Sequence, residues 1–446
     1  MMIRLEVCLI APRQCNCEVC LNQSLKRLQH LSTRTHAQWI LSAVLGVLML
    51  ISWFVAIALP SVQSQSDNQI IGYRSLSFAN ADYSSPTEGK SQSTLWWNDG
   101  SWWADMFNAA DQSHHIYHLN WDEQHWEDTG TVLDERDRVH SDCLWDETTQ
   151  KLYVISHVPA SIPRTTPLDE RGFFYRYSYD PITKQYTRDA GYPVVVTPGS
   201  AQAVTLAKDS LRQLWITYVF HGQVVVRRTS GEDQVWLDSY PLPASGASTA
   251  LNDISAIIAF NGQIGITWSN RERDSMHFAV HVDGTPDDQW KEEIIIEGYR
   301  AADNHLHLAV DTNGIVYAAG KTSARGNDPL LMLYVREAPD TWTHHVFGYR
   351  HDGHTRPVIL IDNVNRRLYM FATAPQSGGS IYYKSTPLDE IAFSEGLGTP
   401  ILRYPNATRL NDVTSTKQGV NNETGIVILA SDRTTAAYYY NVVPIE

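Results

Sequence analysis

Histidines, carboxylates and a single arginine recur where several short predicted strands begin. Histidine titrates near neutrality and suits general base catalysis, and an arginine fork can hold the carboxylate of an acidic ligand. The candidate catalytic residues are His140, Asp142, Asp253, His305 and His354. The candidate ligand-binding residues are Asn304, His307, Arg356, Asp412, Lys417 and Trp103. Together they could bind an acidic sugar and remove a proton from it.

Three chemistries fit these residues. Arg356 could hold a uronate carboxylate and acidify its α-proton, with a histidine or tyrosine as the base of a lyase reaction. Asp142 and Asp253 could instead be the paired carboxylates of glycoside hydrolysis. A metal held by His305, His307 and His354 is a third alternative, although we expect no metal and no cofactor. Each residue could also serve only to bond backbone groups and water.

The segment 301–322 shows which elements would position these side chains. A strand at 305–310 is predicted before the turn 311–314, which ends in Asn313-Gly314, and a second strand follows at 315–320. Asn-Gly is the strongest short hairpin signal. The polar residues of this unit precede the first strand or lie inside it.

Similar units recur along most of the chain. They start near residues 93, 140, 200, 252, 304, 354 and 411, at intervals of 47 to 60 residues. Each unit contains about four predicted strands, except the last, which contains three. This period is typical of a β-propeller. We therefore predict an all-β, seven-bladed propeller, with six blades as the alternative, closed by a strand at 70–78 that completes the last blade.

The propeller explains why residues distant in sequence could form one site. The first strand of each blade lines the central channel, so the candidate residues would converge at one mouth of that channel. A channel without a binding or catalytic site would carry small or apolar residues at these positions. The sequence places histidines, carboxylates, amides and one arginine there.

The N-terminal part has a different character. Residues 1–38 form a basic tail that contains four of the five cysteines, and residues 39–59 carry no charge. As a helix this apolar segment is about 31 Å long, enough to cross a bilayer. The basic flank places the N-terminus in the cytoplasm and the propeller outside. We expect an uncleaved signal anchor, with cleavage near 56–58 and secretion as the alternative.

Composition narrows the classes of partner. The net charge of −14 argues against nucleic acid and against docking on anionic lipid. Cys143 is the one cysteine of the body, so no internal disulfide can form there. We expect a monomer that contacts the membrane through its N-terminal helix and binds a carbohydrate or cell-surface ligand.

Five units share an acidic turn followed by an aromatic residue on the outer strands. The aromatic residues are Trp126, Tyr186, Trp236, Trp290 and Trp342. We interpret them as plates packed between blades. With these degenerate repeats, the chain resembles the BNR/Asp-box propellers of the sialidase-like superfamily over about 70–446. The resemblance implies a family that includes sialidases, other glycan-cleaving enzymes, polysaccharide lyases and non-catalytic lectins.

The predicted organisation is a cytoplasmic tail at 1–38, a transmembrane anchor at 39–59, a linker at 60–69 and a propeller at 70–446. Two functions remain open for the propeller. It could bind and process a glycan at the channel mouth, as a hydrolase or a lyase. Alternatively, it could be a non-catalytic propeller that binds carbohydrate or protein at the same mouth.

Overall fold

The computed structural model describes residues 69–446, apart from 80–84, 161–168, 234 and 446. They belong to one compact unit, Asp67–Glu446. Within the described part of the chain, no helix is long and apolar enough to cross a membrane. The predicted tail, the membrane anchor at 39–59 and nearly all of the linker lie outside the described residues and stay predictions.

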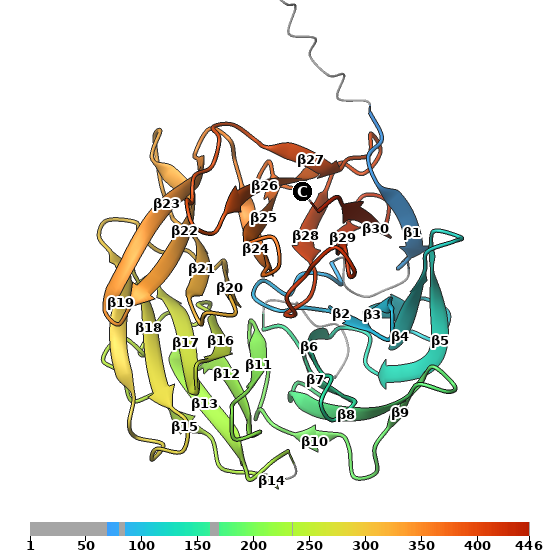
Figure 1. Ribbon diagram of the computed structural model, residues 1–446, viewed down its shortest axis with the longest axis horizontal. Helices are drawn as coiled ribbons and strands as arrows, with labels where there is room; N and C mark the ends of the chain where they lie inside the picture. The colour runs from blue at the N-terminus through green and yellow to red at the C-terminus, as the bar shows by residue number, and fades with distance from the viewer. Residues whose placement is uncertain (1–68, 80–84, 161–168, 234, 446) are drawn as a thin grey trace, which may run out of the picture. The chain divides into compact units, whose positions relative to one another are not determined.

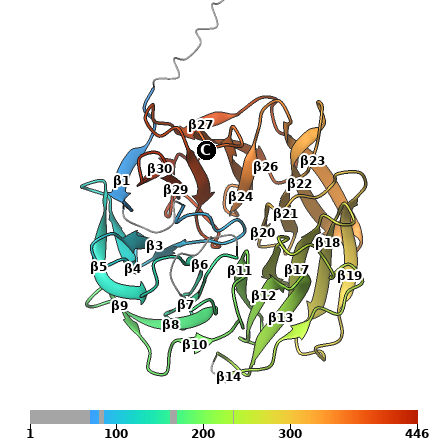
Figure 2. The same cartoon turned by 180° about the vertical axis from the view of Figure 1, so that it is seen from behind.

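The strands form seven separate antiparallel sheets arranged around a centre, as Figures 1 and 2 show from the two sides. Blade 1 contains β2 (Leu95–Asn98), β3 (Ser101–Asn108), β4 (Ser113–Asn120) and β5 (His125–Asp134). Blade 2 contains β6 (His140–Asp146), β7 (Lys151–His157), β8 (Phe173–Asp180), β9 (Gln185–Arg188) and β10 (Val194–Val195). Blade 3 contains β11 (Val204–Lys208), β12 (Leu214–Phe220), β13 (Gln223–Ser230), β14 (Val235–Trp236) and β15 (Tyr240–Pro241).

The other four blades repeat the same meander. Blade 4 contains β16 (Ser255–Phe260), β17 (Gln263–Asn270), β18 (Ser275–Val282) and β19 (Lys291–Glu297). Blade 5 contains β20 (Leu306–Val310), β21 (Val316–Lys321), β22 (Pro329–Ala338) and β23 (Thr341–Tyr349). Blade 6 contains β24 (Thr355–Asp362), β25 (Arg367–Ala374), β26 (Ser380–Pro387) and β27 (Thr399–Leu402). Blade 7 contains β28 (Leu410–Thr414), β29 (Ile426–Asp432), β30 (Ala437–Val443) and β1 (Tyr73–Ser77).

Blade 7 closes the ring with strands from both ends of the propeller. β1 pairs with β30 in the register Tyr73↔Tyr440 and Arg74↔Tyr439. The hydrogen bond from Ser77 to the Ala436 carbonyl oxygen joins residues 359 positions apart in the sequence. The pairing covers an edge that would otherwise be open. The predictions of seven blades and of a closing strand within 70–78 are therefore confirmed.

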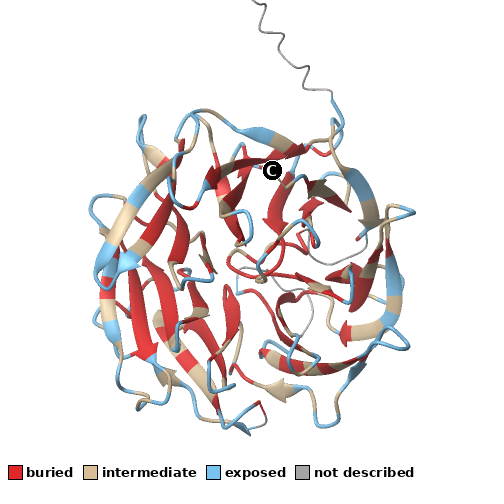
Figure 3. Cartoon of the chain, in the orientation of Figure 1, coloured by how far each residue is buried: buried red, intermediate tan, exposed pale blue. Residues whose placement is uncertain are grey.

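Burial follows position within the blade, as the colours of Figure 3 show. Second strands such as β12, β17 and β25 are buried along almost their whole length. The outermost strand β19 alternates between exposed and buried residues. The reason is that neighbouring blades cover both faces of the middle strands, whereas an outer strand faces solvent.

The recurring outer aromatic residues join adjacent blades. Each of the five packs against an aromatic ring of the preceding blade, with ring centroids 5.1 to 6.0 Å apart. The pairs are Trp126–Tyr440, Tyr186–Trp96, Trp236–Phe174, Trp290–Trp215 and Trp342–Phe278. Their interpretation as plates between blades is confirmed, and the repeat explains why the spacing of the units persists.

Candidate functional site

A segment without regular structure, residues 85–94, crosses the central channel before β2 begins. Figure 1 shows blue chain reaching the centre of the ring. The segment forms hydrogen bonds with four blades. They are Ser85–Asp412 at 2.7 Å in blade 7, Ser91–Ser255 at 3.5 Å in blade 4, Gln92–Val204 at 3.0 Å in blade 3 and Ser93–Asp142 at 2.9 Å in blade 2. It therefore fixes the inner strands of several blades and divides the channel.

Five charged or titratable side chains gather on one side of this segment, where the inner strands start. We call Lys90, Asp303, His305, Arg356 and Asp412 the mouth cluster. The charges of Asp303 and Arg356 both act on the pKa of Lys90, and those of Arg356 and Lys90 act on the pKa of His305. The cluster therefore combines the crossing segment with inner strands of blades 5, 6 and 7.

Two residues of the mouth cluster sit at irregular backbone positions. Arg356 and Asp412 have φ angles of 57° and 58°. In both inner strands the register shifts at these residues, between Thr355 and Val358 in β24 and between Asn411 and Thr414 in β28. A bulge redirects side chains, and left-handed φ is costly for residues other than glycine. The distortions bring the Arg356 guanidinium against the buried Asp412 carboxylate as an ion pair.

Asp303 and His305 form a second pair in the cluster. His305 Nδ1 lies 2.5 Å from Asp303 Oδ1, and Lys321 Nζ lies 3.3 Å from the other carboxylate oxygen. Burial lowers the pKa of His305 to about 4, although Asp303 opposes this shift. The ring is therefore neutral at pH 7 and donates its Nδ1 proton to the carboxylate, which can only accept. This leaves the Nε2 lone pair of His305 available as a base.

The hydrogen bonds around Asp303 keep it ionised. Burial alone would raise its pKa, but the hydrogen bond from His305 and the nearby Lys321 hold the pKa well below the usual range. Burial instead lowers the pKa of Lys90, and the charge of Arg356 lowers it further. Glu88, which pairs with Arg433 at 2.8 Å, counters this effect on Lys90. Within the cluster, the two cations Lys90 and Arg356 thus equal the two carboxylates Asp303 and Asp412 in number.

Asp142 and Asp253 do not form a catalytic pair. Both are completely buried. Asp142 accepts hydrogen bonds from the backbone of Ser93 and Leu206 and pairs with Lys417 at 2.7 Å. Asp253 is bonded by Thr249, Ala250 and Arg271. The two carboxylates share no partner, and the contacts of each hold strands and loops together.

Two of the predicted catalytic histidines are also enclosed. His140 is 4% exposed and its ring lies 6.2 Å from that of His157. His354 is fully buried and its Nε2 lies 3.0 Å from the Leu397 carbonyl oxygen, beside the ring of Phe347 on an outer strand. Burial lowers the pKa of each to about 4. His354 does not join the mouth cluster, whereas His140 lies beside it, since the charges of Asp412 and Lys90 act on its pKa.

The other predicted ligand-binding residues separate into three places. Asn304 is at the mouth, where it donates to the Asn252 carbonyl oxygen at 3.0 Å. His307 and Lys417 line the channel on the far side of the crossing segment. Trp103 is 2% exposed and its Nε1 donates to Asn98 at 3.1 Å, so its ring offers no surface for a ligand.

Sequence reasoning did not find Lys90 and Glu88, and it did not assign a role to Asp303. One signal for the first two was available: residues 79–94 form a long polar connection without strand periodicity. Connections of more than about 12–15 residues without secondary structure are uncommon in compact domains and are often functional. The contacts of the segment, which span four blades, could not be read from local sequence.

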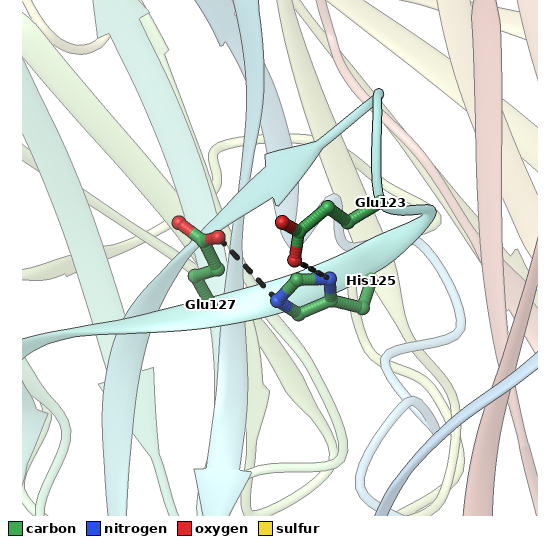
Figure 4. A group of neighbouring side chains, drawn as sticks. All are labelled: Glu123, His125 and Glu127. Carbon is green, nitrogen blue, oxygen red and sulfur yellow. Dashed lines mark ion pairs between the residues drawn. The ribbon is translucent and has the colours of Figure 1, made fainter.

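The histidine metal site is not formed. Among the described residues, the only group with metal-ligand spacing is Glu123, His125 and Glu127, on the β4–β5 hairpin at the outer edge of blade 1 (Figure 4). His125 lies 3.6 Å from Glu123 and 3.4 Å from Glu127. All three side chains are exposed, and such groups pair without an ion, so we assign no metal to them.

The fold and the mouth cluster define this chain as a seven-bladed β-propeller with a charged channel mouth. No known protein family matches the sequence, and no curated protein matches it significantly. Solved propellers resemble it distantly. They include an α-L-arabinanase of Penicillium chrysogenum in complex with arabinobiose, at 10% identity, with 72% of this chain and 99% of that chain covered and a TM-score of 0.44.

Two further solved structures show the same level of likeness. The polysaccharide lyase Uly1 is 9% identical, with 87% of this chain and 94% of that chain covered and a TM-score of 0.45. The NanB sialidase of Streptococcus pneumoniae is 13% identical, with 70% of this chain and 68% of that chain covered and a TM-score of 0.40.

Proposed function

We propose that the propeller binds an acidic glycan at the mouth cluster and removes a proton from it, as a polysaccharide lyase does. The observation that carries this proposal is the Asp303–His305 pair beside Arg356. Asp303 orients the imidazole and fixes its tautomer, and the low pKa of His305, about 4, keeps the ring neutral near pH 7. An oriented, unprotonated imidazole next to a cation can accept a proton α to a carboxylate, and its pKa of about 4 makes it a weaker base than a histidine that titrates near neutrality.

Arg356 supplies the group that would hold the substrate carboxylate. Its Nε pairs with Asp412, and within the described chain its Nη atoms have no other partner. An arginine has five donors, so a second carboxylate can bind it without displacing the first. Bound there, a uronate would lose its C5 proton to His305, and the C5–H electrons would form the C4=C5 double bond as the C4–O bond breaks with its electrons going to the leaving oxygen. That oxygen would then take up the proton held by His305, through water.

A polysaccharide screen tests this proposal with residues 67–446. We expect unsaturated sugar products from one class of polyuronate, and loss of both turnover and binding in Arg356→Ala. His305→Ala should keep binding but lose turnover. His125 is an exposed histidine on an outer strand, so His125→Ala is the matched control and should behave as wild type. Turnover retained in His305→Ala would contradict the proposal.

The alternative is a non-catalytic propeller that binds carbohydrate or protein at the same mouth. It is favoured by the ion pair of Arg356 and Asp412, which rigidifies the mouth without providing an acid for the leaving group. The same screen distinguishes the two functions, because a binder would retain glycan or partner in a mouth-dependent way and form no product.

We also propose that the propeller is displayed outside the membrane by the segment 39–59. The uncharged length of this segment and its basic flank support the proposal. Membrane fractionation and protease shaving of intact cells test it. Recovery of the full chain in the soluble cell fraction would contradict it, and recovery in the medium would indicate cleavage.

A further inference from the structure

The channel contains a cavity on the side of the crossing segment opposite the mouth cluster. Its volume is about 180 Å³, and its walls come mainly from the later halves of β11, β16 and β20. These strands lie side by side around the centre (Figure 1). Ser91 and Ser93 of the crossing segment form part of the wall. The cavity is therefore separated from the mouth by the same segment that bears Lys90.

The walls of this cavity are mostly apolar, and several of their side chains are only half-buried. The half-buried apolar residues are Leu144, Ile258, Ala259, Leu308, Ala309 and Val310. Apolar side chains left open to a concave space, rather than packed, are typical of a small-molecule pocket. An apolar cavity of about 150 Å³ can hold benzene, so this one fits a single substituted ring.

His307 provides one fixed polar group in the cavity. It is 3% exposed, and the backbone N–H of Ile359 donates to its Nδ1 at 3.3 Å. Because Nδ1 accepts, the proton of the neutral ring must lie on Nε2. Within the described part of the chain, that Nε2–H has no partner. Because His307 lines the cavity, this Nε2–H is open to it, and a ligand with an acceptor could bind there.

The cations near the cavity are already neutralised. Lys417 pairs with Asp142 at 2.7 Å and donates to the Leu206 carbonyl oxygen at 2.9 Å. Lys208 pairs with Asp146. Burial and the charge of Lys417 also hold the pKa of His307 at about 3, so the ring carries no charge at neutral pH. The cavity therefore offers no free charge to an ionic ligand.

We propose that this cavity is a second binding site, for a small, uncharged, mainly apolar molecule that accepts one hydrogen bond from His307 Nε2. It differs from the mouth cluster in place and in chemistry. The cavity walls are mainly apolar and both of their lysines are paired with aspartates, whereas the mouth cluster consists of charged and titratable side chains.

Titration of residues 67–446 with two probes of the same shape tests this proposal. Acetophenone carries a carbonyl acceptor, and isopropylbenzene has a methyl group in its place. Followed by ligand NMR, acetophenone should bind about fivefold more tightly, the value expected for one net hydrogen bond. In His307→Leu the preference should reverse, because the carbonyl oxygen of acetophenone would be buried without a donor.

A wall-filling variant keeps the test decisive if His307→Leu does not fold. Ala259 lines the cavity, whereas Ala244 packs against the same hydrophobic cluster outside it. Ala259→Phe should abolish binding of both probes, and the matched control Ala244→Phe should bind them as wild type does. Equal affinity of the two probes for the wild type, no binding of either, or binding unchanged in Ala259→Phe would overturn the proposal.

Discussion

The two halves of the channel are built mainly from different inner strands, with β20 common to both, and they have opposite chemistry. At the mouth, bulges in β24 and β28 and left-handed φ angles at Arg356 and Asp412 present charged groups. In the far half, the ladders of β11, β16 and β20 keep a regular register and present apolar side chains. The charged half thus includes the two irregular inner strands, whereas the apolar half is lined by regular ones.

His305 and His307 show this difference, although they lie only two positions apart in the sequence. Both are neutral at pH 7 because burial lowers their pKa values, to about 4 and about 3. His305 donates to a carboxylate and so carries its lone pair on Nε2, whereas His307 accepts from a backbone N–H and so carries its proton on Nε2. One ring is poised as a base and the other as a donor.

The largest expected effect is on the catalytic step, and it distinguishes the two halves of the channel. His305→Ala should lower turnover of a polyuronate by about 10²–10⁴-fold, the usual contribution of a general base. His307→Ala should leave turnover within about twofold of wild type, because it faces the other half of the channel. Product formation under saturating substrate measures both. Equal losses in the two variants would show that the halves are not independent.

Asp142 lies at the boundary between the halves, and its removal should be nearly as severe. Asp142→Ala leaves Lys417 and the N–H groups of Ser93 and Leu206 without their partner. We expect unfolding free energy to fall by about 3–5 kcal/mol, as when one partner of a buried ion pair is removed. Urea unfolding measures the loss, and Asp122→Asn at an exposed turn is the control. A loss below 1 kcal/mol would contradict the structural role.

Acid should destabilise the protein through both histidines. Their pKa values are lowered by folding, so the unfolded chain binds protons first, and stability falls as the pH drops from about 6.5 toward 4. Each histidine should account for about 2 kcal/mol between pH 6.5 and pH 5. His307→Asn and His305→Asn should each reduce this pH dependence by a similar amount, because both folded-state pKa values lie below this pH range. Urea unfolding at the two pH values measures this effect, and an unchanged free energy of unfolding would contradict the prediction.

The smallest effect concerns the anchoring of the crossing segment. Ser85 donates to Asp412 at 2.7 Å, and Ser85→Ala should cost about 1 kcal/mol, the net value of a buried hydrogen bond. It should also weaken glycan binding at the mouth while leaving acetophenone binding in the far half unchanged. Thermal unfolding and the two titrations check this, and a loss of acetophenone binding alone would contradict it.

Most of the fold could be predicted from sequence because its signals are local. Hairpin turns such as Asn313-Gly314 and the recurring outer aromatic residues mark each blade independently of the others. The closing strand β1 could be predicted because the last unit lacked one strand and a propeller has to close. Nothing beyond periodicity and turn chemistry was needed for seven blades.

The candidate site could be predicted only in part. Positions at strand starts identified His305, Arg356 and Asp412, because the repeat fixes where inner strands begin. The roles of Asp142 and His354 could not be read, since their partners are distant in sequence and a buried carboxylate looks like a catalytic one. Bulges and the path of residues 85–94 depend on tertiary contacts that leave no local pattern.

A crossed titration tests the two-site account most directly. Residues 67–446 are titrated with trigalacturonate and with acetophenone, each alone and each in the presence of the other. The account predicts that both bind together with unchanged affinities, that Arg356→Ala abolishes only trigalacturonate binding, and that Ala259→Phe abolishes only acetophenone binding. Competition between the two probes, or loss of both in one folded variant, would contradict it.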